Sequence, residues 1–309
     1  MNQANKSNRS VLLREIIRHK AFYFLLIIPL THYIVFRYIP IWNGQIAFKD
    51  FMPLDGVFRS RFVGLQHFRV FVNSFYFIEL LRNTLFYSFG KLLMSVPSAI
   101  ILAIAIYECM RPRLARVVQT LSYFPHFLSW VIMYGILLVL LAPGDGIVND
   151  IIKMFGGEPI AFMTNVRTFP WIVIFSDTWK IMGWSAIIFI AALMGVDPSL
   201  FEAAVVEGAS AVQRVWHITL PCIRPVIVIV VLLRIGTILD AGFAQLIMLY
   251  SIPVYSVGDI IDTWVYRQGL LQFQFSLATA VGIFKGVIGL FLVIFSNWAL
   301  KKITDSSLF

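Results

Sequence analysis

Six long apolar stretches run through this 309-residue chain, and they limit the folds that it can adopt. A helix needs about 20 apolar residues to cross the roughly 30 Å hydrocarbon core of a bilayer. Backbone polar groups within that core must be paired inside the protein, and a helix pairs its own. The sequence therefore predicts an all-α membrane protein with six transmembrane helices, which cover residues 21–39, 84–107, 120–141, 170–194, 225–250 and 278–300.

The composition agrees with a membrane protein. Hydrophobic residues make up 59% of the chain and charged residues 13%, and the mean hydropathy is +0.83, whereas soluble domains average about one quarter charged residues. The net charge of +9 comes from basic residues that lie beside apolar stretches instead of forming one patch. We therefore expect membrane lipid, and no nucleic acid, as a partner.

The basic residues also predict the orientation of the chain. Lys and Arg are denser in the N-terminal tail, the 108–119 and 195–224 loops and the C-terminal tail than in the alternate, longer loops. Because cytoplasmic loops are rich in Lys and Arg, both termini are predicted to be cytoplasmic. We divide the chain into an N-terminal tail (1–20), one transmembrane domain (21–302) and a C-terminal tail (303–309). No small-x-small cleavage site follows the first span, so we expect that span to be uncleaved.

The loop between the first two spans, residues 40–79, has Phe68, Phe71 and Phe75 at helical spacing. This spacing predicts a short helix. The helix either lies in the membrane interface or packs on the outer ends of the spans, and the sequence fits both.

Motifs for enzymatic chemistry are absent from the sequence. The histidines are dispersed, and there is no H-E-x-x-H, no paired-cysteine motif and no G-x-S-x-G. Gly90-Lys91 lacks the first glycine and the following Ser or Thr of a P-loop. We expect a non-catalytic subunit that binds no metal and no cofactor. Cys109 and Cys222 are predicted to be cytoplasmic, where a disulfide is disfavoured.

The segment between the fourth and fifth spans carries the signals of two short helices. Asp197 can cap the first helix, Pro198 suits its first position, and Gly208 suits the left-handed residue that ends it. A second helix is predicted over 210–218, with Pro221 stopping it. The segment is poor in basic residues and lies between spans, which disfavours a DNA-binding helix-turn-helix.

The same segment resembles the EAA loop of ATP-binding-cassette (ABC) importer permeases. Every anchor of that pattern is present, namely Glu202, Ala203, Ala204, Gly208, Ile218, Leu220 and Pro221. The resemblance covers about residues 22–302, where the chain is similar to the MalF-like carbohydrate permeases and their LplB-type polysaccharide and oligosaccharide subgroup. The segments that carry it are YIPIWNGQIAFKDF (38–51), FVGLQHF (62–68), RNTLFYS (82–88), VQTLSYFPHFLSWV (118–131) and DTWVYRQGL (262–270).

This resemblance implies a type I ABC importer (MetI-like) fold with a cytoplasmic EAA loop over 197–221. It implies a permease of the bacterial inner membrane that forms half of the pore and imports an oligosaccharide or a polysaccharide-derived sugar. The implied partners are a second MalG-like permease, a homodimeric or heterodimeric ABC ATPase that uses ATP and Mg, and an extracytoplasmic solute-binding protein. Glu202 would pair with a basic group of the ATPase, Gly208 would make the turn, and Ala203 and Ala204 would allow close approach.

A secondary transporter or channel for small polar solutes is the alternative. Ionisable residues at membrane depth mark ion or proton paths, and several of the spans contain them. The complete EAA pattern and the lack of an inverted repeat disfavour this alternative.

A sugar presents apolar C–H faces and a polar rim, so its site combines aromatic and hydrogen-bonding side chains. We predict a substrate pathway from the fourth and fifth spans, formed by Asp177, Trp179, Lys180, Trp184, Asp240, Gln245 and Tyr250. The charged members could instead form structural pairs. Asp177 and Lys180, three residues apart, could neutralise each other, whereas Arg234 and Asp240 share a helix face less well.

Three charged residues near the sixth span have further interpretations. Lys285 lies on a small-residue face suited to close helix contact, with Gly282, Gly286 and Gly289. Asp259 and Asp262, in the last outer loop, could meet the binding protein or simply be solvated.

Overall fold

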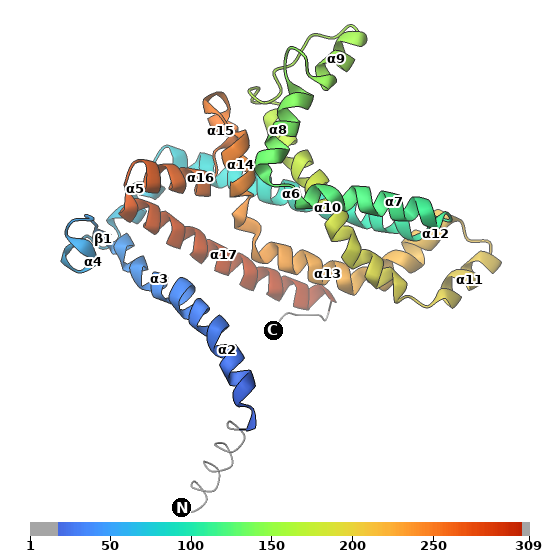
Figure 1. Ribbon diagram of the computed structural model, residues 1–309, viewed down its shortest axis with the longest axis horizontal. Helices are drawn as coiled ribbons and strands as arrows, with labels where there is room; N and C mark the ends of the chain where they lie inside the picture. Colours follow the sequence, from blue (N-terminus) through green and yellow to red (C-terminus); the bar gives the residue numbers. More distant parts are fainter. Residues whose placement is uncertain (1–17, 305–309) are drawn as a thin grey trace, which may run out of the picture.

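The computed structural model describes residues 18–304 (Figure 1). Four long helices pack side by side into a bundle along the longest axis of the molecule. They are α6 (Tyr76–Tyr107), α10 (Phe169–Met194), α13 (Leu220–Gly236) and α17 (Phe275–Thr304). The predicted tails fall largely outside the described residues.

Shorter elements precede and connect these helices. The chain before α6 forms α2 (Lys20–Tyr33), a π-helical turn (Ile34–Tyr38), α3 (Ile39–Trp42), a 3₁₀ turn (Asn43–Phe48), β1 (Lys49–Asp50), α4 (Gly56–Arg59), β2 (Arg61–Phe62) and α5 (Gln66–Val72). Between α6 and α10 lie α7 (Pro112–Tyr123), a 3₁₀ turn (Phe124–Phe127), α8 (Trp130–Leu141) and α9 (Ile147–Met154). Strands β1 and β2 pair antiparallel, with Lys49 opposite Phe62.

The connections of α13 are the most irregular. Between α10 and α13 lie α11 (Pro198–Val206), α12 (Ala211–Arg214) and a π-helical turn (Val215–Thr219). Between α13 and α17 lie a 3₁₀ turn (Ile238–Asp240), α14 (Phe243–Leu249), a second 3₁₀ turn (Ile252–Val254), α15 (Tyr255–Gly258), α16 (Ile261–Tyr266) and a π-helical turn (Arg267–Leu271).

Five helices of the described residues are long and apolar enough to cross a membrane. They are Lys20–Phe48, Tyr76–Tyr107, Phe169–Met194, Ala211–Gly236 and Phe275–Trp298, and the bent pair α7–α8 can supply a sixth. The first, second, fourth and sixth predicted spans each lie within one helical segment of the structure. The third and fifth do not.

The third predicted span, 120–141, is wrong as a single helix. Helix α7 ends at Tyr123, a 3₁₀ turn with Pro125 follows, and the two helical segments meet at 109°. Ser129 caps α8, because its side-chain oxygen accepts a hydrogen bond from a backbone N–H of the first turn (3.3 Å). Proline lacks a backbone donor and ends regular helix, so an unbroken apolar run here contains a sharp corner.

The fifth predicted span, 225–250, is also wrong. The helix begins at Ala211, ends at Gly236 and is separated from the short helix α14. Ala241 and Gly242 have φ values of 39° and 87°, in the left-handed region that a regular helix cannot contain. The residues around this break are mostly apolar, so hydropathy alone does not locate it.

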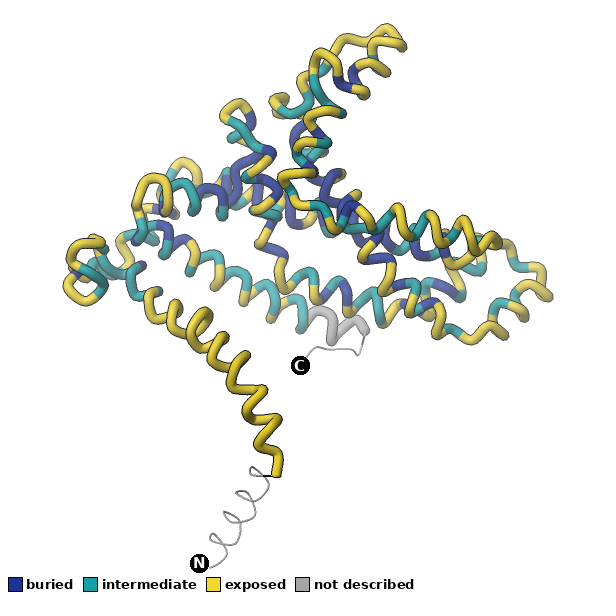
Figure 2. The backbone as a smooth tube through the Cα atoms, in the orientation of Figure 1, coloured by how far each residue is buried: buried dark blue, intermediate teal, exposed yellow. Residues whose placement is uncertain are grey.

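Helix α2 stands apart from the bundle, and its residues are exposed along its whole length (Figure 2). The chain joins the bundle at the 3₁₀ turn Asn43–Phe48, which packs on α17 and buries Ala47 completely. A helix that is apolar on all sides must lie against lipid or another protein.

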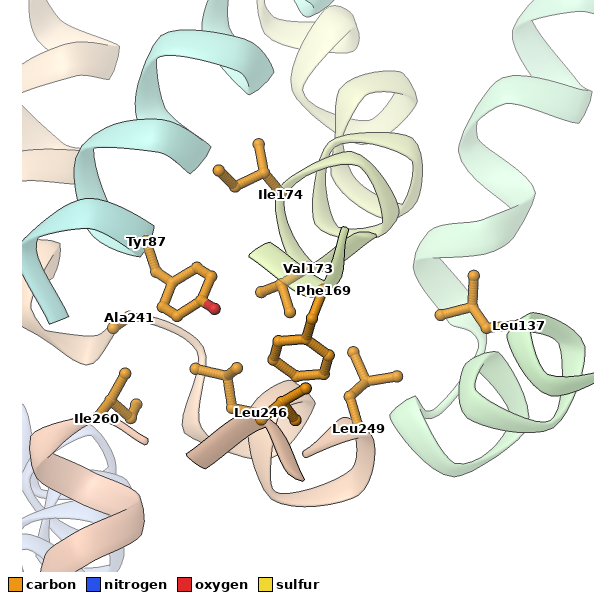
Figure 3. Packing of buried hydrophobic residues seen from close by; sticks show 10 residues of the cluster. Tyr87, Leu137, Phe169, Val173, Ile174, Ala241, Leu246, Leu249 and Ile260 are labelled. Carbon is orange, nitrogen blue, oxygen red and sulfur yellow. The ribbon is translucent and has the colours of Figure 1, made fainter. Parts of the chain in front are cut away.

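Buried apolar residues join the bundle helices to the segment after the break in α13. The cluster in Figure 3 brings Tyr87 of α6, Phe169 of α10 and Leu246 of α14 together. The Tyr87 hydroxyl donates a hydrogen bond to the Val257 carbonyl (2.7 Å), so this buried phenol is satisfied. The position of α14 is therefore set by packing against two intact helices.

The outer helix predicted in the 40–79 loop exists as α5, and it packs on the bundle. Phe71 is buried and contacts the rings of Phe77, Trp264 and Phe284 at centroid distances of 5.3, 5.4 and 5.6 Å. These contacts favour the packing interpretation of this helix.

Helices α10 and α7 come into close contact at Gly183. A Cβ atom at this position would collide with the backbone of Ser122 and Tyr123, which cannot rotate away. We expect Gly183→Ala to lower the stability of the protein by about 1–3 kcal/mol, the usual cost of overpacking. Thermal unfolding of the detergent-solubilised chain measures this effect.

Gly135→Ala is the matched control. Gly135 is also a helical glycine, in α8, but a Cβ atom added there would meet nothing within 4 Å. Alanine at this position should leave the midpoint temperature of thermal unfolding unchanged or raise it slightly. Equal midpoints for the two variants would contradict the close contact between α7 and α10.

Candidate functional site

Helix α11 forms as the sequence predicts. Pro198 occupies its first turn, and the Asp197 side chain accepts a hydrogen bond from the Ser199 backbone N–H (3.0 Å). That hydrogen bond lowers the pKa of the Asp197 carboxyl. The cap is therefore present at neutral pH and is lost only as the pH falls through this lowered pKa.

Gly208 ends α11 in the left-handed conformation, with φ of 78°. The Gly208 N–H donates to the Val205 carbonyl (3.0 Å) and the Ala209 N–H donates to the Ala204 carbonyl (2.9 Å). This pair of hydrogen bonds is a Schellman motif, which satisfies the last carbonyls of the helix. The turn predicted at Gly208 is therefore confirmed.

The second helix begins at its expected place but continues further. Ser210 and Gln213 form a reciprocal capping box at its start. The helix then passes through the π-helical turn into α13, so the prediction that Pro221 stops it is wrong. A π-helical turn shifts the hydrogen-bond register, and here it ends at Thr219, two residues before Pro221, which lacks a backbone N–H.

We name residues 197–221 the coupling bracket. It projects beyond the ends of the bundle helices at one end of the molecule (Figure 1). Glu202 and Ala203 are exposed, Ala204 and Ile218 are half-buried, and none of the described basic residues forms an ion pair with Glu202.

Apolar side chains that the sequence analysis did not single out are also exposed on the bracket. They are Val206 (86% exposed), Val212 (67%) and Trp216 (65%). A carboxylate beside exposed apolar residues fits a protein interface better than a solvated loop. Their position between the EAA anchors is the sequence feature by which these residues could have been identified.

A second candidate region is a buried network around Lys91, at the middle of α6. The Lys91 ammonium donates hydrogen bonds to the Ala241 carbonyl (2.8 Å) and to Gln245 Oε1 (2.5 Å), and lies 3.6 Å from Asp177 Oδ1. Gln245 donates in turn to the Val173 carbonyl (2.7 Å). The network ties α6 and α10 to the break after α13.

Two residues of the predicted pathway therefore have structural partners. Gln245 is 0% exposed, so in this conformation its amide holds Lys91 and α10 and does not face an open path. Asp177 pairs with Lys91, and the predicted pairing of Asp177 with Lys180 is wrong. The two lysines face different partners because their positions in the bundle differ, which spacing along one helix does not reveal.

Lys180 binds the corner between α7 and α8. Its ammonium donates to the carbonyls of Pro125 (3.2 Å) and His126 (2.9 Å), and also to the Leu128 carbonyl. The Pro125 carbonyl also accepts from the Leu128 N–H (3.2 Å), whereas no described backbone N–H donates to the His126 and Leu128 carbonyls at the corner. A cation that supplies several donors is what such a break at membrane depth requires.

The predicted aromatic pathway residues are more accessible. Trp184 is 45% exposed and its ring stacks on that of His126, with a centroid distance of 4.6 Å. Trp179 is also exposed, and Tyr250 stacks on Tyr255 at 4.9 Å. The structure does not gather the three predicted aromatic residues around one cavity: Trp179 lines one pocket, while Tyr250 lies among the segments after the break.

The acidic residues of the last outer loop are not solvated. Asp259 is buried and forms an ion pair with Arg267. Asp262 accepts a hydrogen bond from Lys285 (2.6 Å), and Lys285 also lies 3.7 Å from Asp240. The solvated interpretation is wrong for both aspartates, since each one has a cationic partner inside the fold. Contact with the binding protein stays a prediction.

The small-residue face beside Lys285 is open within this chain. A Cβ at Gly282 or Gly286 would meet nothing within 4 Å, whereas one at Gly289 would lie 3.6 Å from Leu239 Cδ1. Close helix contact is therefore wrong for the first two glycines inside this chain. They line a groove with the break after α13.

The ionisable residues at the break surround a small cavity of about 250 Å³. Its charged lining residues are Lys91, Asp177, Arg234 and Asp240. Sequence reasoning selected two of these and missed Lys91 and Arg234 as site residues, although both were visible as charges within apolar spans. Among the described residues no cluster of His, Cys, Asp or Glu is arranged to hold a metal ion, and Cys109 and Cys222 are not bonded.

Comparison with known proteins decides the class of this fold. Residues 80–305 match the family described as binding-protein-dependent transport system inner membrane component. The chain belongs to this family. The permease therefore has the type I importer fold expected from the sequence, with a multi-pass membrane domain of five long apolar helices and the bent pair α7–α8 among the described residues.

Full-length relatives extend this result. The permease is 40% identical to the polygalacturonan/rhamnogalacturonan transport system permease protein YteP of Bacillus subtilis (strain 168), over 98% of this chain and 95% of that protein. It is also 40% identical to protein LplB of the same organism, over 94% and 92% of the two chains.

A solved structure supports the same assignment to a family of ABC importer permeases. The permease superposes with a TM-score of 0.87 on a chain of a bacterial ABC transporter involved in the import of the acidic polysaccharide alginate, at 36% identity, covering 95% of this chain and 99% of the other. The predicted LplB-type ABC permease is confirmed, and the secondary transporter is not favoured.

The buried ion pair of Lys91 and Asp177 should be critical for the fold. We expect Lys91→Met to cost about 3–5 kcal/mol, because it leaves the Asp177 carboxylate buried without a cation. The double variant Lys91→Met with Asp177→Leu should recover part of this loss, since it removes both charges. Thermal unfolding in detergent measures both effects.

Lys153→Met is the control for this prediction. Lys153 pairs with Asp150 at 3.3 Å, but both side chains are largely exposed, so the change should cost at most about 1 kcal/mol. A Lys91→Met midpoint equal to that of the control would show that the network around Lys91 contributes little.

Proposed function

We propose that this permease moves an oligosaccharide or a polysaccharide-derived sugar across the bacterial cytoplasmic membrane and forms half of the translocation pore. The observation that carries the proposal is the similarity along nearly the whole chain to YteP, which is named for polygalacturonan and rhamnogalacturonan transport. The likeness to the permease of the alginate importer supports the same class of cargo.

The coupling bracket is proposed to dock on a separate ABC ATPase, a homodimer or heterodimer, which binds and hydrolyses ATP with Mg. The exposed carboxylate of Glu202 would face a basic group of the ATPase, and exposed Val206 and Trp216 would fill apolar contacts. Ala203 and Ala204 leave room for close approach, and Gly208 sets the angle between α11 and α12.

The other three anchors lie where the bracket joins α13. Ile218, Leu220 and Pro221 surround the end of the π-helical turn, and Thr219 between them is buried. In the proposed mechanism they hold the bracket rigidly to α13. A movement of the bracket on the ATPase would then displace the whole helix.

A second, MalG-like permease is the proposed partner within the membrane. The exposed helix α2 and the open face at Gly282 and Gly286 are surfaces that another helix could cover. An extracytoplasmic solute-binding protein would deliver the sugar at the opposite end from the bracket. In this proposal both termini lie in the cytoplasm, which the positions of the basic residues support.

The proposed coupling is tested by substitutions in the bracket. Glu202→Ala removes the exposed carboxylate, and Gly208→Val forces a β-branched residue into the left-handed region, which costs about 1–3 kcal/mol locally. We expect both variants to insert in the membrane with the thermal stability of a folded chain. Binding of the ATPase and ATP-driven uptake in proteoliposomes should be lost.

Gly156→Val is the matched control for Gly208→Val. Gly156 follows α9, has φ of 77° and, like Gly208, has nothing within 4 Å of a Cβ. The same local strain at this distant turn should leave ATPase binding intact. Equal loss of binding in both variants, or unfolding of both bracket variants, would mean that the bracket is only a structural hairpin.

A further inference from the structure

Arg234 differs from the other ionisable residues at membrane depth in its partners. Within the described part of the chain, Lys91, Lys180 and Lys285 each have a carboxylate or several carbonyls as partners. Arg234 donates one hydrogen bond, from Nη2 to Ser185 Oγ (3.0 Å), and forms no ion pair with a described carboxylate. A guanidinium has five N–H donors, so most of its hydrogen-bonding capacity is unused by these residues.

Arg234 lies close to the middle of the membrane. It precedes the end of α13 by two residues. The break that follows lies beside the centre of α17, because Leu239 approaches Gly289 and Asp240 approaches Lys285. A cation at this depth is costly unless it is paired or faces a water-filled path.

The Arg234 side chain lines the cavity of about 250 Å³ at the break. Non-helical backbone at membrane depth is tolerated where it lines such a space. Substrate sites of membrane transporters occur near the midplane beside interrupted helices for this reason. The volume is close to the lower end of ligand pockets, about 300 Å³, so it suits one charged group with part of a sugar ring.

The other charges of the cavity are already matched. Asp177 lies 3.6 Å from the Lys91 ammonium, and Asp240 lies 3.7 Å from the Lys285 ammonium. Lys285 also pairs with Asp262, so these three carboxylates are balanced by Lys91, Lys285 and Arg234 together. Among the described charged residues that line the cavity, Arg234 is the one without an ion pair within 4 Å. The planar fork of a guanidinium matches a carboxylate, which it binds through two parallel hydrogen bonds.

We propose that Arg234 binds a carboxylate of the transported saccharide, and that the substrate class is an acidic, uronate-containing oligosaccharide. The proposal rests on the proposed function as a sugar permease. Ser185 acts as a positioning residue, since its hydroxyl holds one end of the guanidinium. The carboxylate replaces water around Arg234 as the sugar passes the break.

The test uses the complete importer, with this permease, its second permease, the ATPase and the binding protein, in proteoliposomes. The probes are a trimer of galacturonate and its methyl ester, which has the same size without the charge. Variants Arg234→Gln and Arg234→Lys are compared with the unchanged chain, and Lys153→Gln on exposed α9 is the control. ATP hydrolysis stimulated by loaded binding protein is recorded beside uptake.

We expect Arg234→Gln to lower uptake of the acidic trimer at least about tenfold, the effect of losing a hydrogen-bonded charge. Uptake of the ester, where the unchanged importer accepts it, should stay within about twofold, as should all activities of the control. Arg234→Lys should lie between the two, because it keeps the charge without the fork. Stimulated ATP hydrolysis should fall less than uptake, since the coupling bracket is intact.

Four results would overturn the inference. In the first, Arg234→Gln leaves uptake of the acidic trimer unchanged. In the second, Arg234→Gln lowers uptake of the acid, uptake of the ester and ATP hydrolysis equally. In the third, the unchanged importer moves the ester as well as the acid. The first two make Arg234 a structural residue, and the third removes selection for charge. An importer that moves neither trimer but does move a neutral oligosaccharide also refutes the acidic class and leaves the sugar permease standing. Failure to move any saccharide refutes the proposed function itself.

Discussion

Backbone carbonyls that lose their helical partners at membrane depth are the constraint on which this structure depends. The chain interrupts two apolar stretches, at the corner between α7 and α8 and at the break after α13. In each case a lysine from an intact neighbouring helix supplies the missing donors. Lys180 binds the carbonyls of His126 and Leu128, and Lys91 binds that of Ala241. These lysines pair carbonyls that the hydrocarbon core of a bilayer cannot satisfy, and so make the interruptions possible.

Each interruption has a consequence for the shape of the protein. The corner at Pro125 directs α8 away from the bundle, toward the projecting segment that carries α9 (Figure 1). The break after α13 opens the cavity that Arg234 lines. The same stretch of helix, Ala211–Gly236, runs without interruption from the coupling bracket to this cavity. One continuous helix therefore connects the exposed bracket at one end of the molecule with the charges at the middle of the membrane.

Sequence patterns predicted the parts of the fold that depend on local rules. Long apolar stretches identify helices in a membrane because every backbone group must pair, and caps such as Asp197 and Gly208 identify the bracket because they satisfy specific backbone groups. The class of protein followed from the spacing of the EAA anchors. These signals lie within about 25 residues of one another along the chain and do not depend on tertiary contacts.

The interruptions and the choice of charge partners could not be predicted in this way. Hydropathy is continuous across Pro125 and across Ala241, so the corner and the break are invisible to a count of apolar residues. Asp177 pairs with Lys91, far away in the sequence, instead of Lys180 on the same helix. Gln245 was expected to face a sugar and is instead buried against α6 and α10. All of these depend on which helices become neighbours, and one sequence does not contain that information in readable form.

The central claim is that this chain is one part of an ABC importer and is driven through its bracket. The most direct measurement is purification of the detergent-solubilised protein from its native membrane, with mass spectrometry of the proteins that accompany it. The account predicts a second permease and an ABC ATPase in stable proportion, with the ATPase missing when Glu202 is replaced by alanine. Recovery of this chain alone, still taking up solute in liposomes under an ion gradient without ATP, would contradict the account.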